Sequence, residues 1–226
     1  LYRFSAYDSE PTPAEFVQAS PKVEYSIECI KTVKEHHEKT KTPMSGQVIY
    51  STSGVPCFHL IQKYIIEYLG LKPNEVGVIA NKKETKIGKS RKTKEEVQDA
   101  FLGRRLDMSD PNKPRYIEIP DSERVKVLIG SSAIKEGVNL QYYSTCLYNC
   151  ELEWNPTDFE QVVGRIWRQK NAFANVRIVV PILENSHDAF MFVALRDKTV
   201  RINEIWERDG SNEFDLDEYD PTELGR

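Results

Sequence analysis

The feature that most constrains this chain is an alternation of short apolar runs with longer amphipathic segments. Strand-like runs stand at 47–52, 76–80, 125–130, 145–150 and 175–182. The stretches between them carry apolar residues at helical spacing. Because strands that alternate with helices are joined by right-handed crossovers, the pattern predicts an α/β fold whose mostly parallel sheet is covered by helices on both faces.

Local signals mark where helices begin and end. A helix is expected over residues 56–69 and is stopped by Gly70. Thr93 and Glu96 have the spacing of a capping box, so another helix is expected to begin there. A further helix is expected from about Thr157.

The two ends differ from this central pattern. Residues 1–20 contain Pro11 and Pro13 and are followed by Pro21, and they resemble an extended arm or linker. Apolar residues at helical spacing after Pro21 predict an amphipathic helix. The chain end is rich in Asp and Glu, and is expected to be a helix that runs into an acidic tail. The expected parts are 1–44 (arm and helix), 45–203 (α/β lobe, with an insertion or long loop at 103–124) and 204–226 (acidic tail).

Charge and cysteine content restrict the class of protein. The net charge of −4 argues against a protein that coats nucleic acid indiscriminately, so any such contact requires a local basic patch. The four cysteines lack the paired spacings of a zinc site and are expected to be buried free thiols; no metal site is predicted. No run is long enough for a membrane span and no leader resembles a signal peptide, so a cytoplasmic protein is expected, nucleoid-associated if bacterial.

Functional groups of a parallel sheet gather at the carboxyl ends of its strands, and two such junctions have unusual sequences. They are SSAIKEGVNLQ at 131–141 and EWNPTDFEQVVGRIWRQKN at 153–171. In the second, Gln161, Gly164, Arg165 and Arg168 have the spacing QxxGRxxR. Two arginines three apart on a helix share a face that suits a polyanion, and Gly164 would leave room beside them. The alternative is a solvated basic stripe.

The order EGVNLQ, WNP, QVVGRIWRQ resembles motifs V and VI of superfamily 2 helicases. It is most similar to the Swi2/Snf2-like ATPases and their bacterial RapA-type relatives, and IYSTSG at 49–54 resembles motif IV. The resemblance covers residues 45–182 and implies a RecA-like three-layer α/β/α lobe, the second of a pair. WRQKN and NCELEWNP depart from the usual family pattern, which leaves the subfamily open.

The resemblance also implies roles for individual residues. Arg168 would be the arginine finger that reaches the γ-phosphate of ATP, with Arg165 beside it and Gln161 near the nucleotide. Fingers supplied across an interface stabilise the charge of the transition state. Residues of the first junction would lie at the nucleotide cleft or contact the nucleic-acid backbone. The cleft residues are Glu136, Gly137 and Asn139, and the backbone contacts are Ser131 and Ser132.

The same resemblance implies partners. ATP and Mg²⁺ would be held mainly by an N-terminal RecA-like lobe, so the present chain alone is expected to be inactive. The expected output is translocation on double-stranded DNA, with unwinding of DNA or RNA as the alternative.

Lysines and arginines are concentrated between residues 82 and 94, and Lys86, Lys89 and Arg91 are candidates for phosphate contacts. A solvated loop is the alternative. The string IGKS in this segment ends like a P-loop, but Lys83 stands where the first glycine of that motif belongs, so a P-loop is not predicted.

Two other classes of function remain open. One is a binding adaptor that kept a helicase-like fold and lost catalysis; the spacing of Gln161, Arg165 and Arg168 weighs against it. The other is a small-molecule enzyme, which the lack of a glycine-rich dinucleotide loop disfavours.

Overall fold

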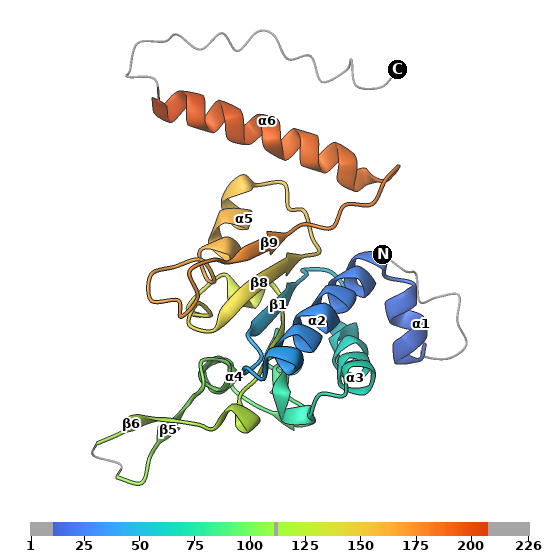
Figure 1. Cartoon of the computed structure of the whole chain (residues 1–226). Helices are drawn as coiled ribbons and strands as arrows, with labels where there is room; N and C mark the ends of the chain where they lie inside the picture. Colours follow the sequence, from blue (N-terminus) through green and yellow to red (C-terminus); the bar gives the residue numbers. More distant parts are fainter. Residues whose placement is uncertain (1–10, 111–112, 208–226) are drawn as a thin grey trace, which may run out of the picture.

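The computed structural model describes residues 11–110 and 113–207 (Figure 1). In this part of the chain, seven strands form one sheet in the order β4-β3-β2-β7-β1-β8-β9. Five of them, from β2 to β9 in that order, are parallel, and β3 and β4 are antiparallel additions at one edge. The strands are β1 (Gly46–Tyr50), β2 (Val76–Ile79), β3 (Lys86–Ile87), β4 (Ser90–Arg91), β7 (Val127–Gly130), β8 (Ser144–Asn149) and β9 (Arg177–Val179).

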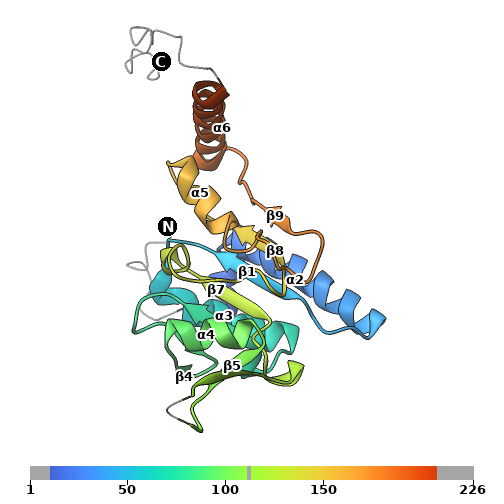
Figure 2. The same ribbon diagram turned by 90° about the vertical axis from the view of Figure 1, so that its left-hand side faces the viewer.

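Helices cover both faces of this sheet, which confirms the predicted α/β architecture. Residues of α1, α2 and α3 share one hydrophobic cluster with the strands, and residues of α4 and α5 share the other. Figure 2 shows α2 and α4 on opposite sides of the strands. The helices are α1 (Pro13–Gln18), α2 (Pro21–Thr40), α3 (Phe58–Leu69), α4 (Lys94–Phe101), α5 (Pro156–Val163) and α6 (His187–Glu207).

The predicted helix signals are confirmed where they fall on α3 and α4. Gly70 ends α3 in a left-handed conformation with φ 63°. Thr93 caps α4 by accepting a hydrogen bond from the Glu96 amide, and the Glu96 carboxylate accepts one from the Thr93 amide.

Two segments differ from expectation. Residues 13–18 form α1 rather than an extended arm, because Thr12 and Glu15 make a capping box and Pro13 takes the first helical position, where its missing N–H costs nothing. Residues 103–124 were expected to be an insertion or a long loop. They contain an antiparallel hairpin of β5 (Arg104–Asp107) and β6 (Arg115–Glu118), which projects from the sheet (Figure 1), so the long-loop alternative is wrong and the insertion stays a prediction.

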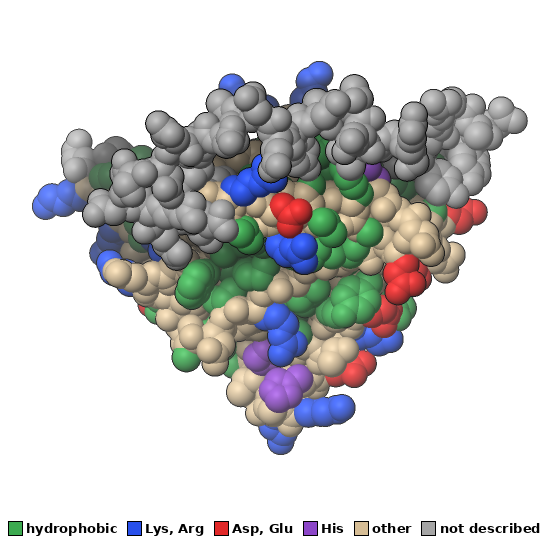
Figure 3. All heavy atoms as spheres, turned by 90° about the horizontal axis from the view of Figure 1, so that it is seen from above, with side chains coloured by type: hydrophobic (Ala, Val, Ile, Leu, Met, Phe, Trp, Pro, Cys, Tyr) green, Lys and Arg blue, Asp and Glu red, His purple; other side chains and the backbone are tan. Residues whose placement is uncertain are grey.

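The C-terminal part also differs. Helix α6 begins at His187, well before the predicted acidic tail at 204–226, and residues 208–226 lie outside the described part of the chain. On the face that carries α6, Figure 3 shows hydrophobic side chains gathered among Lys and Arg side chains. The exposed apolar residues of α6 include Phe190, Phe192, Val193 and Val200.

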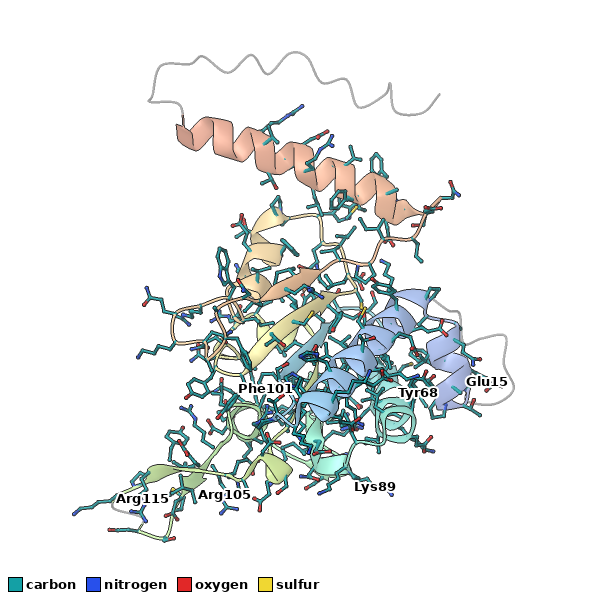
Figure 4. The ribbon with its side chains drawn as sticks, in the orientation of Figure 1. Glu15, Tyr68, Lys89, Phe101, Arg105 and Arg115 are labelled. Atoms are coloured by element: carbon teal, nitrogen blue, oxygen red, sulfur yellow. The ribbon has the colours of Figure 1, made fainter. Side chains whose placement is uncertain are left out.

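Close packing positions the start of β1 against α4. Phe101, fully buried, points into the interior (Figure 4), and a Cβ at Gly46 would lie 2.7 Å from its ring. Only glycine therefore fits at position 46 without movement of the helix.

The cysteines are free thiols in the structure. Cys146 and Cys150 are buried and join the same hydrophobic cluster as α2, so they lie on one side of the sheet, as expected for residues four apart at a strand. Burial raises the pKa of both thiols to about 11, which keeps them protonated at neutral pH.

Candidate functional site

The first junction follows β7 and is a loop held by buried apolar residues. Ser131 caps a 3₁₀ turn, Ser132–Ile134, and the fully buried Val138 and Leu140 anchor the rest of the loop. Gly137 has φ 65°, a conformation that side-chain-bearing residues adopt at a cost. The anchors leave four residues exposed to solvent, namely Ser132, Glu136, Gly137 and Asn139.

The second junction begins with a helix start and ends in a turn. The Asn155 side chain accepts a hydrogen bond from the Thr157 amide, and Pro156 takes the first helical position, so the WNP segment is the N-terminal cap of α5. Helix α5 ends at Val163. Arg165 and Arg168 lie beyond it, and the expectation that both project from one helical face is wrong.

Gly164 is the C-cap of α5 with φ −64°, so its backbone suits any residue. The atoms nearest to an added Cβ are carbonyl oxygens of its own turn, on Glu160 and Gln161. The space beside Gly164 is therefore otherwise open, and Gln161 is exposed next to it.

Hydrogen bonds join the two junctions. Arg168 donates from Nη1 to Asn139 Oδ1 at 2.9 Å. Arg165 donates from Nε to the Lys135 carbonyl at 2.8 Å, with a second bond from Nη2, and the Leu140 amide donates to the Arg165 carbonyl at 3.0 Å. The structure thus brings both predicted arginines against the loop that carries Gly137 and Asn139.

Lys135 lies at the centre of a charged network. Its ammonium contacts a carboxylate oxygen of Glu153 and lies 3.0 Å from Asp158 Oδ1. The other Glu153 oxygen accepts a hydrogen bond of 2.7 Å from the Tyr50 hydroxyl. Burial acts to lower the pKa of Lys135, but its hydrogen bonds to the two carboxylates outweigh burial and raise that pKa above its usual value. Burial, with a smaller effect of Glu153, also raises the pKa of Tyr50.

Helix α4 supports the same loop, which sequence reasoning missed. The Asn139 amide donates to Gln98 Oε1 at 2.8 Å, and Lys94 donates from Nζ to the Glu136 carbonyl. Nothing in the sequence marks Gln98 or Lys94, because the contacts span about 40 residues. For Lys135 the sequence did contain a signal, because the first junction carries this lysine and the second carries the acidic residues Glu153 and Asp158.

The candidate phosphate contacts after β7 differ in accessibility. Ser131 is only 4% exposed, its amide donates to the Ile79 carbonyl, and its hydroxyl accepts from the Ala133 amide. Its polar groups are therefore committed to the fold. Ser132 is exposed and is the better placed of the two serines to meet a ligand.

The basic segment forms a short hairpin at the sheet edge, and its three candidates occupy different positions in it. Lys86 and Arg91 are cross-strand partners in β3 and β4. Lys89 lies in the turn between them, where the Gly88 amide bonds to the Val76 carbonyl at the amino end of β2. Figure 4 shows Lys89 at the lower edge of the molecule, away from α5.

The IGKS string lies in this same hairpin. A P-loop joins a strand to a helix and wraps a phosphate with its backbone. Here Gly88 has φ 54°, and a Cβ on it would lie 2.9 Å from the Pro73 carbonyl oxygen. The hairpin turn therefore requires glycine at this position. The geometry agrees with the absence of a P-loop at this segment.

Comparison with protein families identifies the region that contains both junctions. Residues 62–170 match the model described as the helicase conserved C-terminal domain. This region, slightly less than half of the chain, is thus similar to the C-terminal domain of helicases. Its two junctions lie within the matched residues or, for the last residue of the second, directly beside them.

One solved structure resembles this chain in fold, and a second match is weaker. The C-terminal part of the Fun30 ATPase domain has a TM-score of 0.51 and 15% sequence identity, and the match covers 77% of this chain and 44% of that one. A Dbp5 variant of S. cerevisiae, bound to RNA and ADP with BeF3, has a TM-score of 0.43 and 10% identity, covering 77% of this chain and 36% of that one. The chain spans less than half of either structure. No curated protein matches the sequence.

Helix α6 packs on the second junction through Trp154. The indole lies edge-on to His187 and Phe190, and Lys198 donates from Nζ to the Trp154 carbonyl at 3.1 Å. The Trp154 ring therefore contacts α6, although 54% of the residue is exposed.

Other features lie apart from the two junctions. A cavity of about 720 Å³ lies between α2 and strands β8 and β9. Within residues 11–110 and 113–207, no group of three or more His, Cys, Asp or Glu side chains is arranged to hold a metal ion. No helix in those ranges combines the length and hydrophobicity needed to cross a bilayer.

Proposed function

We propose that this chain is the C-terminal motor lobe of an ATP-dependent DNA translocase of the Swi2/Snf2 type. Its catalytic groups would act on ATP held by an N-terminal RecA-like lobe of the same protein. One observation supports this assignment most: Arg165 and Arg168 both contact the loop that contains Gly137 and Asn139. Nucleotide contacts and nucleic-acid contacts would therefore be coupled through a few side chains.

Arg168 has the properties required of an arginine finger. It is exposed, and its partner, the Asn139 amide oxygen, is neutral and also exposed, so the guanidinium can exchange this bond for a phosphate oxygen. The neighbouring Trp167 is 72% exposed. An arginine and an aromatic side chain turned outward together suit a surface that a second lobe covers.

Arg165 would hold the turn with one side of its guanidinium, so that only the other side could reach the nucleotide. Two of its five N–H donors are used on the Lys135 carbonyl, which leaves the Nη1 side free for phosphate. Gln161, exposed on α5, would lie on the nucleotide side of the same turn.

Mg²⁺ would neutralise charge on the phosphates of ATP and would be held by carboxylates of the N-terminal lobe. The groups that this chain presents at the turn are cationic or amide donors, which fit phosphate oxygens and not a metal ion. Its contribution to the reaction is thus electrostatic.

On the nucleic-acid side, Lys86 and Arg91 stand side by side on an edge hairpin and, with the exposed Ser132, would contact the phosphate backbone. Lys89, in the turn at the other end of the hairpin, would be less important than its neighbours.

The decisive experiment measures DNA-stimulated ATP hydrolysis by the parent protein, in which an N-terminal lobe precedes this chain. Arg168→Ala is expected to lower kcat by about 10³-fold or more, as for fingers supplied across an interface. Arg196→Ala, at an exposed arginine of α6, is the matched control and should leave kcat unchanged. An Arg168→Ala variant with normal kcat would favour the adaptor alternative, in which the fold binds nucleic acid or protein without catalysis.

A further inference from the structure

Lys135 connects both ends of the second junction through two different groups. Its ammonium lies 3.0 Å from Asp158, in the first turn of α5, and contacts Glu153 just before the helix. Its carbonyl accepts the bonds from Arg165, which follows the helix end. One residue of the first junction thus contacts the beginning and the end of the second.

The network is anchored in the core. Glu153 is bound through its other oxygen to the hydroxyl of Tyr50, a buried residue of β1. The side chain of Lys135 is 13% exposed, so its ion pairs are poorly screened by solvent. The position of the Lys135 carbonyl therefore depends on contacts that reach the central strand.

The charges of the network balance. Lys135 and Arg165 carry two positive charges, and Glu153 and Asp158 carry two negative charges. Without the ammonium, two partly buried carboxylates would face each other unpaired, and the start of α5 would move away from the loop. The Lys135 carbonyl would then no longer be fixed opposite the Arg165 guanidinium.

We propose that Lys135 is a positioning residue whose ammonium, held by Glu153 and Asp158, fixes its own carbonyl as the acceptor that orients Arg165. This role rests on the proposed function, because it matters for catalysis only if the arginines act on ATP. Lys135 itself touches neither ATP nor nucleic acid in this role.

The chain offers a matched control in Lys126. That side chain is 14% exposed and also lies between two carboxylates, 2.8 Å from Glu75 and 3.2 Å from Asp121. It precedes β7, whereas Lys135 follows it, so the two lysines stand at opposite ends of one strand. Loss of either ammonium should disturb stability similarly, but only Lys135 is linked to Arg165.

The first test follows the Nε–H group of Arg165 by hydrogen exchange in ¹⁵N NMR spectra of the whole chain, with Arg165→Lys to assign the signal. Lys135→Met should accelerate this exchange at least tenfold, while Lys135→Arg and Lys126→Met should keep it slow. Should Lys135→Met not fold, Asp158→Asn provides the same test at a more exposed position. Unchanged exchange in the Lys135 or Asp158 variants, or equal acceleration by Lys126→Met, would overturn the proposal.

The second test uses ATP hydrolysis by the parent protein. Lys135→Met should lower kcat at least tenfold with little change in KM for ATP, and Lys126→Met should not. If Arg168→Ala abolishes activity and Lys135→Met behaves like Lys126→Met, the positioning role fails while the proposed function stands. If Arg168→Ala is fully active, the proposed function fails, and the NMR test still decides whether Lys135 holds Arg165.

Discussion

Arg168 donates a hydrogen bond of 2.9 Å from Nη1 to Asn139 Oδ1, although 29 residues separate them in sequence. The bond joins the turn after α5 to the loop between β7 and β8, next to the amino end of β8, where Asn171 Nδ2 donates to the Ser144 carbonyl. Because both side chains are exposed, this contact is readily exchanged for another partner.

Asn139→Asp tests that exchange. A carboxylate would replace a neutral acceptor, and charge-assisted hydrogen bonds are roughly twice as strong as neutral ones, so Arg168 would be held on its own loop. We expect kcat of the parent protein for ATP to fall about tenfold, since each 1.36 kcal/mol added to the barrier costs about that factor. Asn139→Ala should lower kcat by a smaller factor than Asn139→Asp does. An Asp variant that is faster than the Ala variant would contradict this role for the bond.

Gly137→Ala should destabilise the chain, because φ at this position is 65° and the strain of a left-handed conformation costs about 1–2 kcal/mol. Gly164→Ala is the matched control: its φ is −64°, so little change in the free energy of unfolding is expected. Urea unfolding of the two variants would measure the difference. Equal stability would show that the loop relaxes around a side chain.

His37 should make the stability of the chain depend on pH below neutrality. Burial, together with the charges of His36 and Arg124, lowers the pKa of His37, and its Nε2 accepts a hydrogen bond from the Ser45 amide. The unfolded chain therefore takes up a proton first, near pH 6.5. Stability is full above that pH and is lost as the pH falls through the lower folded pKa.

Urea unfolding between pH 7.5 and 5 checks this prediction. His37→Gln should show a shallower loss of unfolding free energy on acidification than the wild type. Parallel pH profiles for the two proteins would show that His37 does not contribute.

Charge reversal on the edge hairpin tests the nucleic-acid contacts. If Lys86 and Arg91 each neutralise one phosphate, replacing both with Glu should reduce the slope of log K against log salt by about 1.8, since each contact on B-DNA contributes about 0.9. Binding of labelled DNA, followed by fluorescence anisotropy at several salt concentrations, gives the slope. Lys89→Glu, in the turn at the other end, should change it much less. Equal effects at all three positions would indicate a diffuse electrostatic attraction.

The sequence predicted the fold because the fold depends on local, periodic signals. Alternating apolar runs imply strands and crossovers, and the capping signals at Gly70 and Thr93 act within a few residues. Strand ends of a parallel sheet meet at one edge, so the two junctions were expected to be functional. The N-terminal arm was misjudged because the capping box at Thr12 and Glu15 was overlooked.

The direction and partner of each side chain were decided only by the tertiary structure. The spacing of Arg165 and Arg168 implied one helical face, but α5 ends at Val163 and each arginine bonds to a different part of the loop. Lys86, Lys89 and Arg91 were grouped by sequence, and the hairpin makes Lys86 and Arg91 cross-strand partners while Lys89 lies in the turn. Such contacts join residues far apart in the chain, and no local propensity specifies them. Sequence thus determined which side chains the two junctions carry, and packing of the loops determined which partner each side chain contacts.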